Sequence, residues 1–228
     1  MRMNGEHGPS LRRRSGAAVN ALLKRAGLRM VPVDALELRL TSAVAGRDLP
    51  FPAGGVSDDA VLLRQLNSAD VDLISRFTDD SPAAWLSMQG ALHAAGLALD
   101  LAVVDRASGS AAGLIQLQRF DWPNHRASIG LWLLPEARGR GLMTHALTLL
   151  VGWTFSEGIL DRIEYLAQTD NERSIRLAER CGFKQEGELR SCLVMGRCRH
   201  DAVLLAALRD DWRPCIDGRA ADGTEPRD

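Results

Sequence analysis

The chain is short of lysine, of aromatic residues and of long apolar runs. Its 28 basic residues include only two lysines, Lys24 and Lys184, and the formal net charge is −1. A nucleic-acid binder normally carries a clear basic excess, so we expect no nucleic-acid partner. No apolar run approaches the ~18 residues that cross a bilayer, and residues 1–14 lead into no continuous apolar segment. We therefore expect neither a membrane partner nor a signal peptide.

Cysteine is also scarce. The four cysteines contain no C-x-x-C pair, and no pair of histidines has the spacing of a zinc site. This pattern predicts no metal and favours reduced thiols in a cytoplasmic protein. The cysteines are Cys181, Cys192, Cys198 and Cys215.

The length of 228 residues, 46% of them hydrophobic, is enough for one domain of typical size and an appendage. Residues 1–56 read as an extension of unknown role, partly disordered, with a short helix over 17–29 and a strand over 36–40. Regular periodicity predicts a folded domain over 57–213, and a polar tail follows over 214–228.

Within that domain the pattern predicts a strand, two helices, three strands, and then helices and strands in alternation, ending in two strands. Such an order implies one mixed sheet with helices on its faces. The expected strands are 61–66, 97–104, 113–120, 127–133, 163–167, 188–195 and 201–208, and the expected helices are 69–77, 82–95, 141–157 and 171–181.

The most informative segment runs from Leu131 to Met143, where an apolar strand stops at Pro135 and an Arg-Gly-Arg-Gly turn precedes a helix. This order gathers free backbone N–H groups at a helix N-terminus, which suits a phosphate or pyrophosphate. The turn lacks the Gly-Lys-Ser/Thr of a Walker loop. Thr144 stands where a dinucleotide fingerprint needs its third glycine.

Two further segments make the pattern more specific. Asp170-Asn171-Glu172-Arg173-Ser174 leads to Cys181-Gly182-Phe183, and Gly196-Arg197-Cys198-Arg199-His200-Asp201 precedes an apolar run. Together with the turn, they resemble the landmarks of the GNAT acyltransferases, RimJ/RimL branch, over roughly residues 60–212. The resemblance implies an α/β fold with a single mixed, mostly antiparallel sheet of about six or seven strands and about four helices.

The resemblance also implies acetyl-CoA as cosubstrate. In this family the turn binds the pyrophosphate, and the preceding strand pairs with the pantetheine arm where two strands splay apart. The implied cofactor-binding residues are Leu131, Trp132, Leu133, Arg138, Gly139, Arg140, Gly141, Leu142, Met143 and Asn171.

Asn171 and Ser174 share one helical face because they lie three residues apart. In the family, the matching asparagine contacts the cofactor and the matching serine lies near the cofactor sulfur. The resemblance therefore implies that Ser174 donates to the leaving thiolate. A simple N-cap at Asn171 and a solvated serine at 174 are the alternatives.

No general base carries over from the family. Ser128 stands where many relatives have a glutamate before Ile129-Gly130, and Leu193 stands near the place of a second family glutamate. His125 is the favoured candidate because histidine titrates near neutral pH. The other candidates are His145, Asp121 and Glu136, with His145 favoured for a packing or rim role.

A site without a strong base suits an amine that is already partly neutral. A peptide α-amino group has a pKa of about 7.7–8.0, against about 10.4 for lysine. We therefore expect the acceptor to be a protein N-terminus, such as that of a ribosomal protein. An antibiotic or amino sugar, a non-catalytic acyl-CoA-binding module and a regulator that binds a partner through residues 1–56 remain alternatives, and a homodimer is left open.

Overall fold

The computed structural model describes residues 49–195, 198–213, 215–216 and 219–220. The chain divides into two compact units, 1–42 and 43–228, and every described residue belongs to the second. The helix expected over 17–29 and the strand expected over 36–40 lie outside the described residues.

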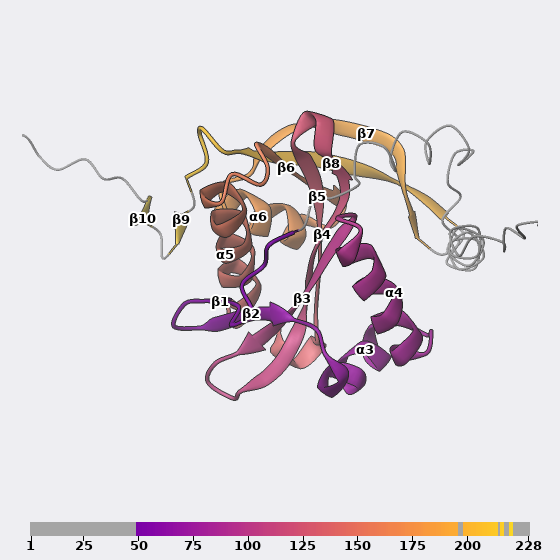
Figure 1. The fold of residues 1–228 in the computed structure, drawn as a ribbon. Helices are drawn as coiled ribbons and strands as arrows, with labels where there is room; N and C mark the ends of the chain where they lie inside the picture. The colour runs from indigo at the N-terminus through magenta and orange to yellow at the C-terminus, as the bar shows by residue number, and fades with distance from the viewer. Residues whose placement is uncertain (1–48, 196–197, 214, 217–218, 221–228) are drawn as a thin grey trace, which may run out of the picture. The chain divides into compact units, whose positions relative to one another are not determined.

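One eight-stranded sheet forms the centre of the described unit, in the order β1-β2-β3-β4-β5-β6-β8-β7 (Figure 1). β5 and β6 pair in parallel, and the other neighbouring strands pair antiparallel. The strands are β1 Val56–Ser57, β2 Val61–Gln65, β3 Ala98–Asp105, β4 Ser110–Asp121, β5 Arg126–Leu133, β6 Arg162–Gln168, β7 Lys184–Met195 and β8 Cys198–Leu208.

Four α-helices cover the sheet. They are α3 Val71–Phe77, α4 Pro82–Ala94, α5 Leu142–Ser156 and α6 Glu172–Arg180. Figure 1 shows α3 and α4 on one side and α5 and α6 on the other. A cluster of Leu73, Ile74 and Trp85 packs on Leu114 of β4 and so fixes α3 and α4 to their face. The expected fold is thereby confirmed.

The structure differs from the sequence-based expectation in several details. β1, which has two residues, was not expected, because so short a strand has no recognisable period. β4 and β7 are longer than expected, because cross-strand pairing extends them. Serine is a favoured N-cap residue, and Ser81 precedes the expected helix, but its side chain makes no capping hydrogen bond.

The helix α5 is more deeply buried than the amphipathic pattern indicated. The three-and-four spacing of the apolar residues predicts a core face made of Leu142, Ala146, Leu149, Leu150 and Trp153; Leu149 is half-buried and the other four are buried. Met143, Leu147, Val151 and Phe155 on other sides of the helix are buried as well. Phe51 adds to the cover of α5, because it packs edge-on against Trp153 with ring centroids 4.9 Å apart.

Two short strands, β9 Cys215–Ile216 and β10 Arg219–Ala220, form a separate two-stranded sheet. Within the described part of the chain, no helix has the length and apolar content that crossing a membrane requires.

Candidate active site

The turn before α5 presents a row of unpaired backbone N–H groups. Within residues 49–195 and 198–213, no acceptor takes a hydrogen bond from the amides of residues 139–143. The first paired amides are those of Thr144 and His145, both bonded to the Gly141 carbonyl. Five consecutive free donors at a helix N-terminus suit an anion, because the helix dipole adds partial positive charge there.

The two glycines leave the space above these amides open. Gly139 and Gly141 have φ angles of +78° and +77°, in the left-handed region that side chains rarely adopt. A Cβ built on Gly139 meets no atom within 4 Å, and one on Gly141 meets only His145 at 4.0 Å. A ligand can therefore approach the main chain closely.

Neighbouring side chains at the rim are held in place by carboxylates. The Arg140 guanidinium lies 2.7 Å from buried Asp105, which lowers the pKa of Asp105. His145 Nδ1 lies 2.7 Å from Asp58 Oδ2, which agrees with the rim role expected for this histidine. The turn and the first residues of α5 are thus fixed to the β1–β2 connection and to the end of β3.

The sheet opens beside this turn. The parallel pairing of β5 with β6 runs from Arg126 opposite Arg162 to Ile129 opposite Tyr165 and then stops. β5 continues to Leu133 in register with β4, while β6 continues in register with β8. The segment from Gly130 to Leu133 therefore has one unpaired edge, at the splay that the family resemblance implied.

The direction of the backbone along this edge follows from one hydrogen bond. The Leu134 N–H donates to the Ala112 carbonyl in β4. Because backbone groups alternate along a strand, residues 130 and 132 also face β4, and Leu131 and Leu133 face the splay. The Leu133 carbonyl accepts bonds of 3.2 and 3.1 Å from the Arg138 guanidinium, as this alternation requires. Leu131 and the Leu133 N–H thus offer main-chain partners to an extended ligand, while Arg138 binds the Leu133 carbonyl.

Trp132 has a different position. Its backbone faces β4, and its ring packs against Phe77 with centroids 5.5 Å apart, at the edge of the α3–α4 cluster. The side chains of Leu142 and Met143 are buried, so these two residues face the turn with their backbone amides alone.

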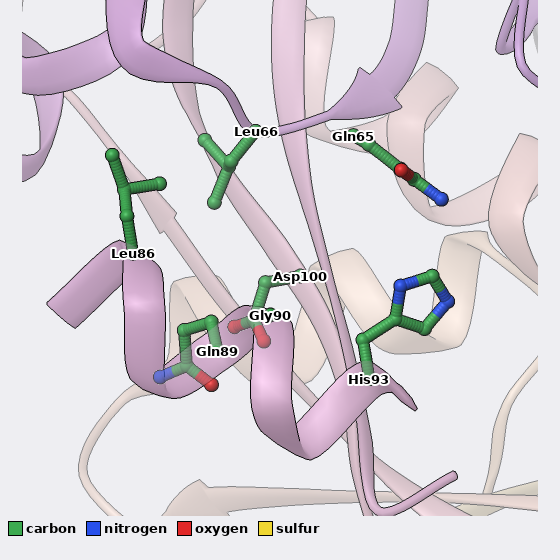
Figure 2. Close-up of a pocket in the computed structure, with 7 residues that line it drawn as sticks. All are labelled: Gln65, Leu66, Leu86, Gln89, Gly90, His93 and Asp100. Atoms are coloured by element: carbon green, nitrogen blue, oxygen red, sulfur yellow. The ribbon is translucent and has the colours of Figure 1, made fainter. Parts of the chain in front are cut away.

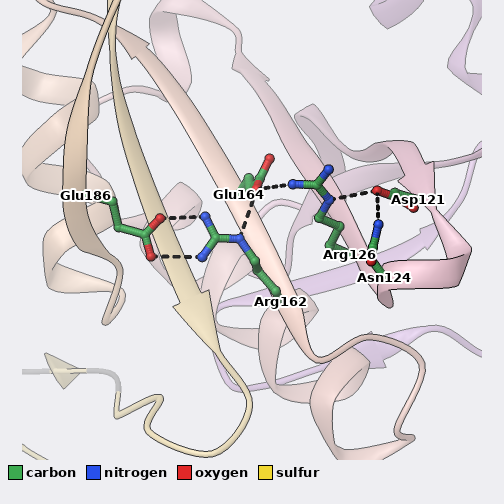
Figure 3. A network of polar contacts seen from close by, with 6 residues as sticks. All are labelled: Asp121, Asn124, Arg126, Arg162, Glu164 and Glu186. Carbon is green, nitrogen blue, oxygen red and sulfur yellow. Dashed lines mark hydrogen bonds and ion pairs between the residues drawn. The ribbon is translucent and has the colours of Figure 1, made fainter.

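A chain of ion pairs holds the closed end of the splay together (Figure 3). Arg162 binds Glu186 through both terminal nitrogens and Glu164 through Nε. Glu164 also accepts from Arg126, which pairs with Asp121. Exposed ion pairs contribute little singly, but this network links four strands just where β5 and β6 are still paired.

Asn171 and Ser174 lie at the start of α6, beside β6. Asn171 is the N-cap, and its side-chain oxygen accepts from the Ser174 N–H at 3.2 Å. The Ser174 hydroxyl lies 2.6 Å from the hydroxyl of buried Tyr165, the last β6 residue paired with β5. Burial raises the pKa of Tyr165, so its hydroxyl stays protonated and can donate to Ser174. Tyr165 is a neighbour of Ser174 that the sequence pattern did not single out.

The candidate bases are dispersed. His125 stands before β5, with Nδ1 3.5 Å from Asp161. It precedes Ile129, the residue paired with Tyr165, by four residues, or about 13 Å along the strand. Asp121 is paired with Arg126, and Glu136 with Arg76 on the surface. Leu193 pairs with His200 in the β7–β8 hairpin. The structure does not bring His125 together with Asn171 and Ser174.

One buried carboxylate was missed by the sequence analysis. Asp100, in the middle of β3, is 8% exposed and accepts a hydrogen bond from Gln116 in β4. Among the described residues, no group bonds to its second oxygen, Oδ2. Burial raises the pKa of Asp100 to about 6, although the Gln116 bond opposes this shift.

Asp100 lines a cavity between the sheet and α4 (Figure 2). Figure 2 shows its carboxylate directed toward α4, where Gln89, Gly90 and His93 lie. No alternation or motif marks this position, because the cavity exists only when β3, β4 and α4 are packed. Among the described residues, no cluster of three or more potential ligands could hold a metal ion.

The described geometry is that of a GNAT fold, and comparison with known proteins agrees. Residues 57–184 match the family described as acetyltransferase (GNAT) domain. The chain belongs to this family.

Three curated proteins are similar to this chain in sequence. The putative ribosomal N-acetyltransferase YdaF of Bacillus subtilis is 36% identical over 104 residues, 46% of this chain and 57% of YdaF. Spermidine N(1)-acetyltransferase of Escherichia coli K12 is 31% identical over 47% of this chain and 53% of its own. Ribosomal-protein-serine acetyltransferase of the same strain is 32% identical over 43% and 55%. The chain thus spans about half the length of these relatives, and the ribosomal names of the first and third support the RimJ/RimL branch.

Solved structures share the fold over more of the chain. A probable acetyltransferase is 25% identical with a TM-score of 0.62, covering 68% of this chain and 96% of its own. The microcin C7 self-immunity acetyltransferase MccE, solved with acetyl-CoA and AMP, is 22% identical with a TM-score of 0.62 over 71% and 99%. The latter similarity concerns the fold alone.

Proposed function

We propose that the protein is an N-acetyltransferase that transfers the acetyl group of acetyl-CoA directly to a primary amine. The observation that carries this proposal is the run of free amides at residues 139–143, beside the unpaired edge of β5. A pyrophosphate fits the amides, and an extended amide-bearing arm fits the edge formed by Leu131 and Leu133.

The chain's own residues then supply three functions. The turn and the edge of β5 hold the donor, and main-chain N–H groups facing the splay polarise the thioester carbonyl as its oxygen gains charge. Ser174, supported by the Tyr165 hydroxyl, donates a proton or hydrogen bond to the departing thiolate. The amine attacks as the neutral species: the C–N bond forms, the C–S bond breaks, and the proton that the nitrogen loses passes to solvent water.

The proposed acceptor is the α-amino group of a protein N-terminus, in a cytoplasmic setting. Its low pKa suits a site to which no strong base has been assigned. YdaF and the E. coli serine acetyltransferase carry ribosomal names, which supports this choice. A small amine is the second candidate, supported by the spermidine acetyltransferase relative.

The test is a measurement of CoA release from acetyl-CoA with a panel of N-terminal peptides and small amines. Release that depends on the acceptor, with the acetyl group found on its nitrogen, supports the proposal. Tight acetyl-CoA binding without turnover on any acceptor would instead favour an acyl-CoA-binding module.

Replacing Ser174 with alanine should lower kcat by about 10- to 100-fold, since general acid catalysis typically contributes at least that much. The Kd for acetyl-CoA should stay nearly unchanged, because the pyrophosphate turn is intact. Steady-state kinetics and calorimetry measure the two quantities. A matched Ser156→Ala variant at the far end of α5, which loses only a bond to the Trp153 carbonyl, controls for loss of a helix serine. Unchanged kcat in Ser174→Ala would remove Ser174 from the mechanism.

A further inference from the structure

The cavity beside Asp100 has properties that the proposed acetyl transfer does not explain. A carboxylate that is 8% exposed, with one oxygen lacking a partner among the described residues, is costly to bury. The two other buried aspartates of the described residues are each paired with an arginine: Asp70 with Arg64 through both oxygens at 2.7 and 2.8 Å, and Asp105 with Arg140 at 2.7 Å. Asp100, in contrast, has no such charged partner among the described residues. A bound ligand could supply one.

The lining of the cavity selects the charge of that partner. The residues around it are Gln65, Leu66, Leu86, Gln89, Gly90, His93 and Asp100, with no lysine or arginine among them. His93 is the other titratable group, and its Nε2 lies 3.2 Å from the Leu49 carbonyl. An ionised carboxylate in this setting attracts a cation that can also donate hydrogen bonds.

Size narrows the choice further. The cavity volume is about 90 Å³. A site for a whole drug-sized ligand needs roughly 300–1,000 Å³, whereas one water occupies about 30 Å³. The space therefore suits one ammonium or guanidinium group and not a complete substrate.

The side chain of Gln116 lies between the cavity and the splay. Asp100, Gln116 and Gly130 stand opposite one another on β3, β4 and β5. Gln116 donates from Nε2 to Asp100, while its Oε1 lies 3.1 Å from where a Cβ on Gly130 would be. The Gln116 side chain thus lies between Asp100 and Gly130, the first residue of the unpaired edge.

We propose that Asp100, positioned by Gln116, binds a cationic group of the acceptor while a second nitrogen of the same acceptor reacts at the splay. This inference rests on the proposed function and names the acceptor class: an amine that carries another positive group several atoms away. Two strand spacings, about 10 Å in total, separate Asp100 from Gly130. That separation is too large for Asp100 to take the proton from the reacting nitrogen, so its role is in specificity.

Two matched pairs of acceptors test the inference and distinguish a peptide acceptor from a small-amine acceptor. One pair is a peptide with lysine or norleucine at its second residue, and the other is 1,4-diaminobutane and butylamine. The wild type should show a KM about 10- to 100-fold lower for the charged member of at least one pair, since a hydrogen bond to a charged group contributes about 1.5–3 kcal/mol. Asp100→Asn should reduce that preference to about threefold or less and leave kcat for the neutral member unchanged.

An Asp72→Asn variant controls for the loss of one negative charge, because Asp72 is exposed on α3. It should retain the wild-type preference. Equal KM values for both members of both pairs in the wild type, or an unchanged preference in Asp100→Asn, would overturn the inference. An equal fall in kcat for charged and neutral acceptors would also overturn it, because it would indicate a role in proton transfer.

Calorimetric titration with diaminobutane and with the lysine peptide measures binding at the subsite without requiring turnover. Binding by the wild type that is weakened at least tenfold in Asp100→Asn supports the subsite even if no acceptor is acetylated, in which case only the proposed transfer fails. No binding of either charged probe to the wild type would refute the subsite, whatever the activity.

Discussion

Gly141→Trp should raise the Kd for acetyl-CoA at least 100-fold, a loss of about 2.7 kcal/mol or more. The glycine is the N-cap of α5 at φ +77°, and the space beyond its Cα is open apart from His145 at 4.0 Å. An indole there would occupy the volume above the free amides and exclude the pyrophosphate. Isothermal titration calorimetry with acetyl-CoA and with free CoA measures the change.

The matched control is Gly158→Trp, at the opposite end of the same helix. Gly158 has φ +64°, and its nearest neighbour is the flexible Arg209 side chain at 3.6 Å. Both substitutions carry a similar backbone cost, but 15 residues of helix, about 22 Å, separate the second one from the turn. Near-wild-type affinity in Gly141→Trp would show that the pyrophosphate binds elsewhere.

Asp100→Asn should raise the free energy of unfolding at pH 7.5 by about 1–3 kcal/mol. The folded-state pKa of about 6 exceeds the value of 3.8 for a free aspartate, so ionising Asp100 costs the folded protein more than the unfolded chain. One pKa unit corresponds to about 1.36 kcal/mol, which sets the upper end of this range. Asparagine keeps the acceptor for Gln116 and removes the charge.

The pH dependence has a definite sign. The wild type loses stability from this group as pH rises from about 4 to about 6, and the full penalty applies above pH 6. The advantage of the variant should therefore shrink as pH falls from 6 toward 4, as urea unfolding at pH 7.5 and pH 4.5 would measure. Asp70→Asn should do the opposite at pH 7.5, because it breaks the buried pair with Arg64. A variant less stable than the wild type at pH 7.5 would contradict an uncompensated charge at Asp100.

The features that could be read from the sequence are local ones. The turn at residues 138–143 was recognisable because strand, glycines and helix start follow one another directly in the chain. Asn171 was recognisable as an N-cap for the same reason, and the structure confirms that its side chain accepts from the Ser174 amide.

The features that escaped prediction depend on pairing between distant segments. Asp100 reads as one polar residue in an apolar strand, and only the register of β3 with β4 brings Gln116 to it. Tyr165 is the sole tyrosine of the chain, but its contact with Ser174 depends on how α6 packs against β6. The general base also stays unassigned, since His125 lies at the closed end of the β5–β6 pairing.

The short pairing between β5 and β6 has a consequence for the stability of the protein. Strands β1–β5 and β6–β8 are joined within the sheet by the four residue pairs from Arg126–Arg162 to Ile129–Tyr165. A molecule lodged between the two groups bridges them only in the native state, and at 100 times its Kd it adds about 2.7 kcal/mol to the unfolding free energy. Resistance to heat and to proteolysis would therefore follow the supply of that molecule as well as the packing of the core.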